Sequence, residues 1–400
     1  MPTPERDSRG PVVWSGQFVL VTVVNTAVMA VFYTFMALMA VFAADVLGAG
    51  GAAAGLAASV FVVAALVARF GAGRVVDVFG PRRVLVVSLG VFAAAGAAYL
   101  VSDSLGALLA VRAVHGFAFG VATTATNTAA QLLLPEARRA EGTGYFTLGL
   151  PLASAAGPPA AFLVVDRFGY DWLFAGAAVV AAGAFGAALA VTAPRAVVSR
   201  EPRGVVAGGS WRDAGIVEPR VASIGVPVLL LGVAASVVLT FTYPLAQSVG
   251  APAAAGAFFV VYAAAVLASR LAAGPIQDRF GSGVVVYPAL AALTASFVVL
   301  GFARSGVQVA AAGVLVGFGH GVLVPAFQVE AVRLAGPLRT GVAVGTFFLF
   351  LDLGTGVGPV VMGRVVEASS YRAMYVATAV LGGAAALAWR LRRGRASGRH

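Results

Sequence analysis

The sequence predicts an all-α integral membrane protein in which twelve transmembrane helices form two six-helix bundles. Three observations predict this fold class: the composition, twelve separate apolar stretches, and an internal repeat. The chain has 400 residues, of which 60% are hydrophobic and only 11% are charged, whereas soluble domains usually carry about 25% charged residues. Such a composition excludes a soluble enzyme, a secreted disulfide-rich domain and a filament, and the absence of cysteine excludes thiol catalysis.

Each apolar stretch is long enough to cross a hydrocarbon layer of about 30 Å as a helix. The predicted spans cover residues 16–44, 52–72, 83–101, 105–134, 141–166, 172–192, 222–248, 253–273, 284–303, 307–332, 340–366 and 371–389. They divide the chain into an N-terminal six-helix bundle (1–192), a linker with several prolines, glycines and arginines (193–221), a C-terminal six-helix bundle (222–389) and a basic tail (390–400).

All 27 basic residues are arginine, and their distribution predicts the orientation in the membrane. With both termini in the cytoplasm, 22 arginines fall in cytoplasmic segments, four fall in outer segments, and Arg112 lies inside a span. This bias predicts a multi-pass protein of the cytoplasmic (inner) membrane. Because the arginines are spread over short loops, we expect no nucleic-acid partner. The tail arginines are expected either to contact anionic lipid headgroups or to act only as a stop-transfer anchor.

Residues 201 positions apart match without a gap over about half of each bundle. The matched pairs include Arg69/Arg270, Gly73/Gly274, Asp77/Asp278, Phe79/Phe280, Gly80/Gly281, Gly157/Gly358, Pro158/Pro359 and Tyr170/Tyr371. The chain is therefore predicted to contain a duplicated six-helix unit. Since six is an even number, both copies run in the same direction, and the pseudo-twofold axis lies along the membrane normal.

Three motifs resemble those of the major facilitator superfamily. Residues 73–83 (GRVVDVFGPRR) resemble the signature between the second and third helices, and residues 274–281 repeat it. Arg112, His115, Gly116 and Gly120 are similar to the fourth-helix motif, and residues 149–158 resemble the fifth-helix antiporter motif, although Pro159, Ala160 and Ala161 replace further glycines. The resemblance implies the major facilitator fold. Together with residues 112–116, Pro135 and residues 141–146, it points to the drug/proton antiporter branch of multidrug and metabolite efflux.

The resemblance also implies a cytoplasmic gate, formed by Gly73, Asp77, Gly80, Arg82, Arg83 and Asp278. Asp77 is expected to join a charge network with Arg82 and Arg83, or to face a helix N-terminus of the other half. The simpler alternative is a tight turn at Gly80 whose arginines only set the topology.

Arg112 and Asp352 are predicted to be buried inside the membrane. Arg112 lies about 12 Å inside the fourth span, where an unpaired guanidinium costs about 2.5–3.5 kcal/mol. His320 and Asp352 are each sixteen residues from Gly336 in a predicted hairpin, so we expect them at the same depth. We predict that they handle protons, opposite Arg112 and His115. The alternatives are that Arg112 bonds backbone carbonyls or extends toward the interface, and that Asp352 caps a helix break.

Polar stripes on the first, fourth and seventh spans predict a mostly neutral, partly aromatic cavity. Its expected lining is Asn25, Tyr33, Thr124, Asn127, Gln131, Thr240, Tyr243, Gln247 and Tyr262. Gly157, Pro158, Gly358 and Pro359 are expected to allow close helix packing and hinge motion. Small and hydroxylated residues are also ordinary packing material in membrane helices, so each single position allows that simpler interpretation.

The sequence therefore predicts a secondary transporter that works by rocker-switch alternating access. The expected activity is proton-coupled efflux of a drug, natural product or metallophore. The alternative is an importer or uniporter with the same fold, and a polytopic membrane enzyme or a scaffold fits less well. No Walker-type loop is present, which excludes an ATP-driven pump. We expect no cofactor, no metal site, no catalytic residues and a monomeric state.

Overall fold

The structure is a computed structural model that describes residues 12–192 and 215–397. The described chain is all-helical and contains twelve helices long and apolar enough to cross a membrane, which confirms the predicted fold class. Most of the predicted linker (193–214) and the last residues of the predicted tail (398–400) lie outside the described residues. Residues 390–397 of that tail continue the last helix.

The first bundle consists of seven α-helices, because its fifth span is divided in two. They are α1 (Gly16–Asp45), α2 (Gly51–Phe79), α3 (Pro81–Ala98), α4 (Leu105–Leu133), α5 (Arg139–Phe146), α6 (Gly149–Phe168) and α7 (Tyr170–Leu189), with 3₁₀ turns η1 (Tyr99–Val101) and η2 (Glu136–Arg138). Its buried apolar side chains form one cluster within residues 13–191.

The second bundle follows the same order after a short helix. It contains α8 (Pro219–Ala222), α9 (Gly225–Ser248), α10 (Ala253–Phe280), α11 (Ser282–Gly301), α12 (Gly306–Ala335), η3 (Pro337–Arg339), α13 (Thr340–Ala368) and α14 (Tyr371–Ser397). A second apolar cluster occupies residues 221–389. Equivalent helices pack together in both bundles. In the first bundle α1 packs against α6, α2 against α4 and α3 against α7; in the second, α9 packs against α13, α10 against α12 and α11 against α14.

The two helices that carry the duplicated motif, α2 and α10, are longer than predicted. The second and eighth spans were expected to end at residues 72 and 273, but α2 and α10 continue to Phe79 and Phe280. Gly80 and Gly281 end them with φ values of 86° and 85°, a conformation that glycine adopts without strain. The predicted boundaries were wrong because charged residues at the end of a helix, beyond the hydrocarbon, lower the hydropathy without ending the helix. Gly73 and Asp77 therefore lie on a helix.

The fifth and eleventh spans differ in continuity. The fifth is interrupted between α5 and α6 at Thr147 and Leu148, whereas α13 runs unbroken from Thr340 to Ala368. Pro151 lacks the N–H that would bond the carbonyl of Thr147, four residues earlier. The equivalent residue in α13 is Asp352, which keeps its N–H. The suggestion that Asp352 caps a helix break is therefore wrong.

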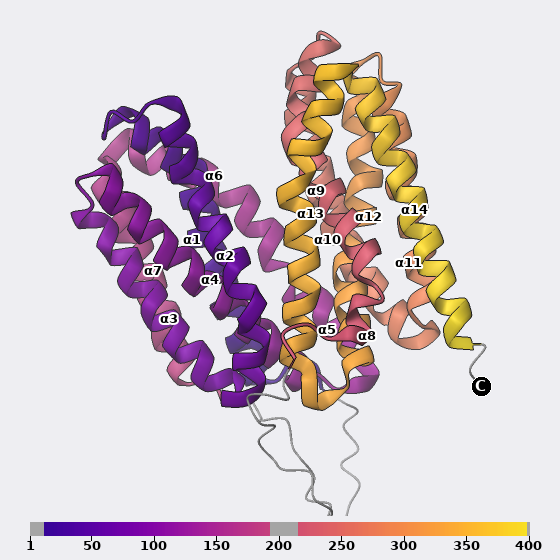
Figure 1. The fold of residues 1–400 in the computed structure, drawn as a ribbon, viewed down its shortest axis with the longest axis horizontal. Coiled ribbons are helices and arrows are strands. Elements are labelled where there is room, and N and C mark those ends of the chain that lie inside the picture. The colour runs from indigo at the N-terminus through magenta and orange to yellow at the C-terminus, as the bar shows by residue number, and fades with distance from the viewer. Residues whose placement is uncertain (1–11, 193–214, 398–400) are drawn as a thin grey trace, which may run out of the picture.

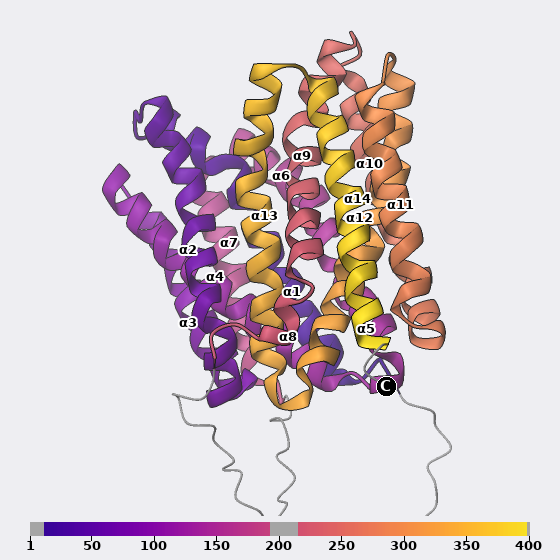
Figure 2. The same ribbon diagram turned by 45° about the vertical axis from the view of Figure 1, so that its right-hand side comes forward.

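The two bundles lie against each other at one end of the molecule and diverge toward the other (Figure 1). We call the close end the motif end, because it carries Gly80 and Gly281. The bundles meet there mainly through α2 with α13 and α10 with α5. The rotated view in Figure 2 shows α13 between α2 and the remaining helices of the second bundle.

Candidate functional site

At the motif end, two aspartates bind helix N-termini of the opposite bundle. The Asp77 carboxylate on α2 accepts the N–H groups of Gly341 and Val342 at 2.7 and 2.8 Å. The first N–H groups of a helix have no partner within the helix and carry partial positive charge, so a carboxylate binds them well. The expected network of Asp77 with Arg82 and Arg83 is replaced by this alternative, contact with a helix N-terminus.

Asp278 on α10 repeats this contact in the other bundle. Its carboxylate accepts the N–H groups of Ala140 and Glu141, both at 2.9 Å. The two pairs of donors are themselves 201 residues apart, like the two aspartates. The duplicated motif thus joins the two bundles twice, once on each side of the pseudo-twofold axis.

Glycine makes this close approach possible. A Cβ atom on Gly73 would lie 2.8 Å from the Cα atom of Val342, and one on Gly274 would lie 2.5 Å from the Cα atom of Glu141. Both contacts are with backbone, which cannot rotate away as a side chain can. Any larger residue at either position therefore separates the bundles at the motif end.

Deeper in the membrane, an ion pair connects the bundles. The Nε atom of Arg69 on α2 donates to Oδ2 of Asp352 on α13. Arg69 is 6% exposed and Asp352 is 27% exposed, so the carboxylate remains accessible while the guanidinium does not. The guanidinium also lies 4.6 Å from the ring centroid of Phe348, within cation–π range.

The equivalent arginine of the second bundle has a neutral partner. Arg270 on α10 donates to the backbone carbonyl of Thr147, at the break between α5 and α6. That carbonyl lacks its usual helical donor because Pro151 has no N–H. It does accept a local backbone hydrogen bond from the Leu150 N–H, which is long at 3.3 Å. The guanidinium supplies the missing hydrogen bond.

A third contact between the bundles lies between α4 and α12. The Nε2 atom of Gln328 donates to Oδ1 of Asn127 at 2.9 Å, and both side chains are buried. These residues are also 201 positions apart, so they meet across the pseudo-twofold axis. Together with the aspartate and arginine contacts, this bond holds the motif end closed.

Arg112 and His115 do not face the second bundle. Arg112 donates from Nε to the Ala57 carbonyl at 2.8 Å and from a terminal nitrogen to the Ala58 carbonyl at 3.0 Å. His115 lies 3.1 Å from the Tyr99 hydroxyl. The structure thus shows the backbone-carbonyl alternative for Arg112. The expected arrangement opposite Asp352 was wrong because the carbonyls of α2 satisfy this buried charge within its own bundle.

His320 is likewise not the partner of Asp352. Its ring lies 6.3 Å from the ring of Tyr262, whereas Asp352 is bound by Arg69. The expected pairing considered only depth in a hairpin, and depth does not determine which face of a helix a side chain occupies. Further along α12, Glu330 binds Arg392 of α14 at 3.0 Å.

The residues predicted to line a cavity separate into two groups. Asn25, Thr124, Asn127 and Gln131 are buried and hydrogen-bonded, whereas Tyr33 and Tyr262 are half-buried and Thr240, Tyr243 and Gln247 are exposed. Asn25 bonds Thr126 and Gln131 bonds Thr143, both within the first bundle. The half-buried and exposed residues remain available to a ligand.

The remaining predicted positions lie at helix contacts and helix ends. Arg82 donates to the carbonyls of Val191 and Leu189, which holds the start of α3 against the end of α7. A Cβ atom on Gly157 would lie 3.1 Å from Cβ of Tyr33, and one on Gly358 would lie 3.1 Å from the Cα atom of Val233. Pro158 and Pro359 lie inside α6 and α13.

Within the described ranges, no group of three His, Cys, Asp or Glu residues has metal-binding geometry.

Sequence reasoning used Arg69 and Arg270 as a matched pair of the repeat and as indicators of topology, assigned them no contact, and did not consider Gln328. The repeat contains the signal that identifies them. Arginine is conserved between the two halves at 69 and 270, inside helices rather than loops, and Asn127 is matched by another amide at 328. Polar residues retained in both copies of a membrane repeat are candidates for contacts across its axis.

Comparison with known proteins places both halves in one family. A family model described as Major Facilitator Superfamily matches residues 20–243 and again residues 224–400. An uncharacterized MFS-type transporter of Pseudomonas aeruginosa is 29% identical over 379 residues, which cover 88% of each chain. Another from Mycobacterium tuberculosis is 34% identical over 116 residues, which are 29% of this chain and 20% of that protein.

Solved structures show the same fold. A human organic anion transporter, TETRAN, has a TM-score of 0.75 at 16% identity, covering 94% of this chain and 100% of that one. The proton:xylose symporter XylE has a TM-score of 0.74 at 15% identity, covering 92% of this chain and 94% of that one. Identities this low establish the fold alone.

Proposed function

Since the chain belongs to the major facilitator superfamily and is a secondary transporter, we propose that it exports a small amphiphilic organic compound in exchange for protons. Members of this family are transporters and not enzymes, so the polytopic-enzyme alternative is set aside. The proposal includes membership of the drug/proton antiporter branch. It places the protein in the cytoplasmic membrane with the motif end and both termini in the cytoplasm, as the arginine distribution favours.

The observation that carries the proposal is the Arg69–Asp352 ion pair between the bundles. It is a titratable contact, and its carboxylate is 27% exposed. A proton that reaches Asp352 from the diverging end neutralises the carboxylate and removes the partner of Arg69. The motif end then loses one of its closing contacts, which favours the state open to the cytoplasm. Proton binding on one side is thereby linked to the change of access that export requires.

The chemistry of the half-buried residues supports an amphiphilic substrate. Tyr33 packs against Phe32 with ring centroids 4.9 Å apart, and Tyr262 packs against Phe259 at 6.5 Å. These rings offer apolar faces with hydroxyl groups beside them, which suit drugs, natural products and metallophores with both aromatic and polar parts. We assign Tyr33, Tyr262, Thr240, Tyr243 and Gln247 to substrate contact, and Asp352 with Arg69 to proton coupling.

The test is substrate-induced proton movement in proteoliposomes that contain a pH-sensitive dye. Hydrophobic cations, antibiotics and metal chelators are added in turn to the wild-type protein and to Asp352→Asn. We expect a proton flux opposite to the substrate flux, and its loss in the variant. Proton and substrate moving in the same direction would replace export by symport. Substrate movement without protons in the wild type would establish a uniporter and remove Asp352 from coupling.

A further inference from the structure

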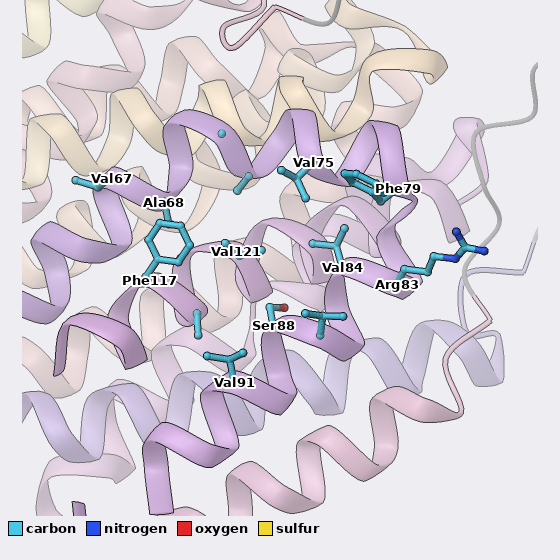
Figure 3. A pocket seen from close by; sticks show the side chains of 14 residues that line it. Val67, Ala68, Val75, Phe79, Arg83, Val84, Ser88, Val91, Phe117 and Val121 are labelled. Atoms are coloured by element: carbon cyan, nitrogen blue, oxygen red, sulfur yellow. The ribbon is translucent and has the colours of Figure 1, made fainter. Parts of the chain in front are cut away.

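A long apolar groove of about 630 Å³ runs along the first bundle between α2 and α3, with residues of α4 as its floor (Figure 3). Its lining consists of Val67, Ala68, Gly71, Ala72, Val75 and Phe79 of α2, Arg83, Val84, Val87, Ser88 and Val91 of α3, and Phe117, Ala118 and Val121 of α4. Val67, Val87 and Phe117 are exposed, so the groove opens on the outer surface of the bundle.

Small residues on α2 create this groove. A Cβ atom on Gly71 would meet nothing within 4 Å, which shows that this position faces open space. Gly71 is two residues from both Arg69 and Gly73, and two helical residues turn the chain by about 200°. The groove therefore lies on the face of α2 away from α13, separate from the contacts that close the motif end.

Hydrocarbon is the chemistry that fits the walls. Ser88, the hydroxyl in the lining, already donates to the Leu85 carbonyl at 3.1 Å and has no further proton to offer. The other wall residues are apolar, except Arg83 at one end. In Figure 3 the Arg83 side chain extends beyond the apolar side chains, and its guanidinium lies at the mouth of the groove.

Arg83 has charge to offer an occupant. Its side chain is exposed, and no ion pair or hydrogen bond of its guanidinium is recorded within residues 12–192 and 215–397. By contrast, the neighbouring Arg82 is bound to two carbonyls. A smaller pocket of about 180 Å³ between α1, α6 and α7 has no charged residue in its lining. Of these two pockets, the larger groove combines apolar walls with an exposed arginine at one end.

The length of the groove matches one leaflet of a bilayer. Along α3, the eight helical steps from Arg83 to Val91 rise about 12 Å, and along α2 the twelve steps from Val67 to Phe79 rise about 18 Å. Half of a hydrocarbon layer of about 30 Å is about 15 Å. An acyl chain in the groove thus reaches the middle of the membrane while its headgroup stays level with Arg83.

We propose that the groove between α2 and α3 is a binding site for one anionic phospholipid, whose acyl chain lies against Gly71 and Ala72 and whose phosphate is bound by Arg83. The site is separate from the proposed substrate and proton residues. A lipid held there supports the outer face of α2 while its inner face contacts α13.

Native mass spectrometry of the full-length protein tests this site. The purified protein is mixed with phosphatidylglycerol or phosphatidylcholine of identical acyl chains, and retained lipid is counted. We expect one phosphatidylglycerol to be retained in preference to phosphatidylcholine. Arg83→Gln should weaken its retention about fivefold, the effect of one arginine at a membrane surface, and Gly71→Leu should abolish it by filling the groove.

Two matched variants control for nonspecific loss. Arg279→Gln removes an exposed arginine at the motif end of the second bundle, and Gly183→Leu enlarges an exposed glycine of α7 that also faces open space. Both should retain phosphatidylglycerol like the wild type. Equal retention of the two lipids, unchanged retention in Arg83→Gln, or equal loss in the controls would each overturn the proposal. Loss of transport in Gly71→Leu with phosphatidylglycerol still bound would identify a substrate path instead, and would also overturn it.

Discussion

The two bundles use the same arginine in chemically different ways. Arg69 binds the carboxylate of Asp352, whereas its repeat partner Arg270 binds the backbone carbonyl of Thr147. The difference follows from one position of the repeat, where the first half has Pro151 and the second half has Asp352. Proline removes a backbone donor and frees a carbonyl, while aspartate leaves the helix intact and adds an acid. One contact is therefore independent of pH, and the other is titratable.

This asymmetry indicates a division of roles between two halves that otherwise match closely. The helix-capping aspartates, the close glycines and the amide pair all obey the repeat, so both bundles contribute equivalent residues to the motif end. Proton coupling requires a group that changes charge, and one such contact is sufficient. We infer that the first half contributes a fixed anchor to Arg270 and the second half contributes the switch.

The largest effect is expected from Asp352→Asn, which leaves the buried Arg69 without a counterion. Loss of a hydrogen-bonded charge pair of this kind costs about 1.5–3 kcal/mol, or about 13- to 160-fold in the population of the closed motif end. The distance between the two bundles at the motif end can be measured with spin labels on cysteines introduced at Ala137 and Leu338, because the chain has no native cysteine. Both positions are exposed, and they are 201 residues apart. The variant should show the longer distance at every pH.

The wild type and Arg270→Gln provide the comparison for that measurement. Protonation removes the negative charge of Asp352, so the wild-type motif end should open as the pH falls. Arg270→Gln should open it to a smaller extent but keep the pH dependence, because Asp352 is intact. A wild-type distance that does not change with pH, or a pH response that survives in Asp352→Asn, would show that the switch lies elsewhere.

The next effect is expected from alanine at the two close glycines. Gly73→Ala and Gly274→Ala each place a methyl group against backbone of the opposite bundle, at a cost near 2 kcal/mol, about the middle of the range for overpacked sites. Both should lengthen the Ala137–Leu338 distance to a similar extent, since the repeat is symmetric here. Gly55→Ala on the same helix adds the same group to open space, outside the proposed lipid groove, and should leave the distance unchanged. An equal response of all three would indicate lost helix flexibility instead of a steric clash.

The sequence predicted the architecture well because long apolar spans and a gapless repeat are local or periodic signals. It also offered a helix N-terminus of the other half as one partner of Asp77, and the structure shows that contact. It failed for the partners of Arg112, His320 and Asp352, because a partner depends on helix rotation and on the approach of the two bundles. Neither quantity is encoded in hydropathy. Arg69 was misinterpreted because it was counted among the cytoplasmic arginines, although it lies within the predicted span 52–72.

The smallest effects are expected from the two capping aspartates, and they should be unequal. Asp77 caps α13, a continuous helix of 29 residues, whereas Asp278 caps α5, which has only 8 residues and ends at the break. Asp278 also receives an N–H from Glu141, whose own carboxylate is negative and bound by Arg138. Both features weaken the attraction between Asp278 and its helix N-terminus.

Asp77→Asn should therefore destabilise the closed motif end by about 1 kcal/mol and Asp278→Asn by about half of that, since a charge at a helix N-terminus contributes about 0.3–1 kcal/mol. The same pair of spin labels measures both changes. An equal response would show that the local N–H bonds, which asparagine partly keeps, matter more than helix length. A larger response at Asp278 would reverse the inferred order and make the broken fifth span, with Arg270 at its end, the more sensitive side of the gate.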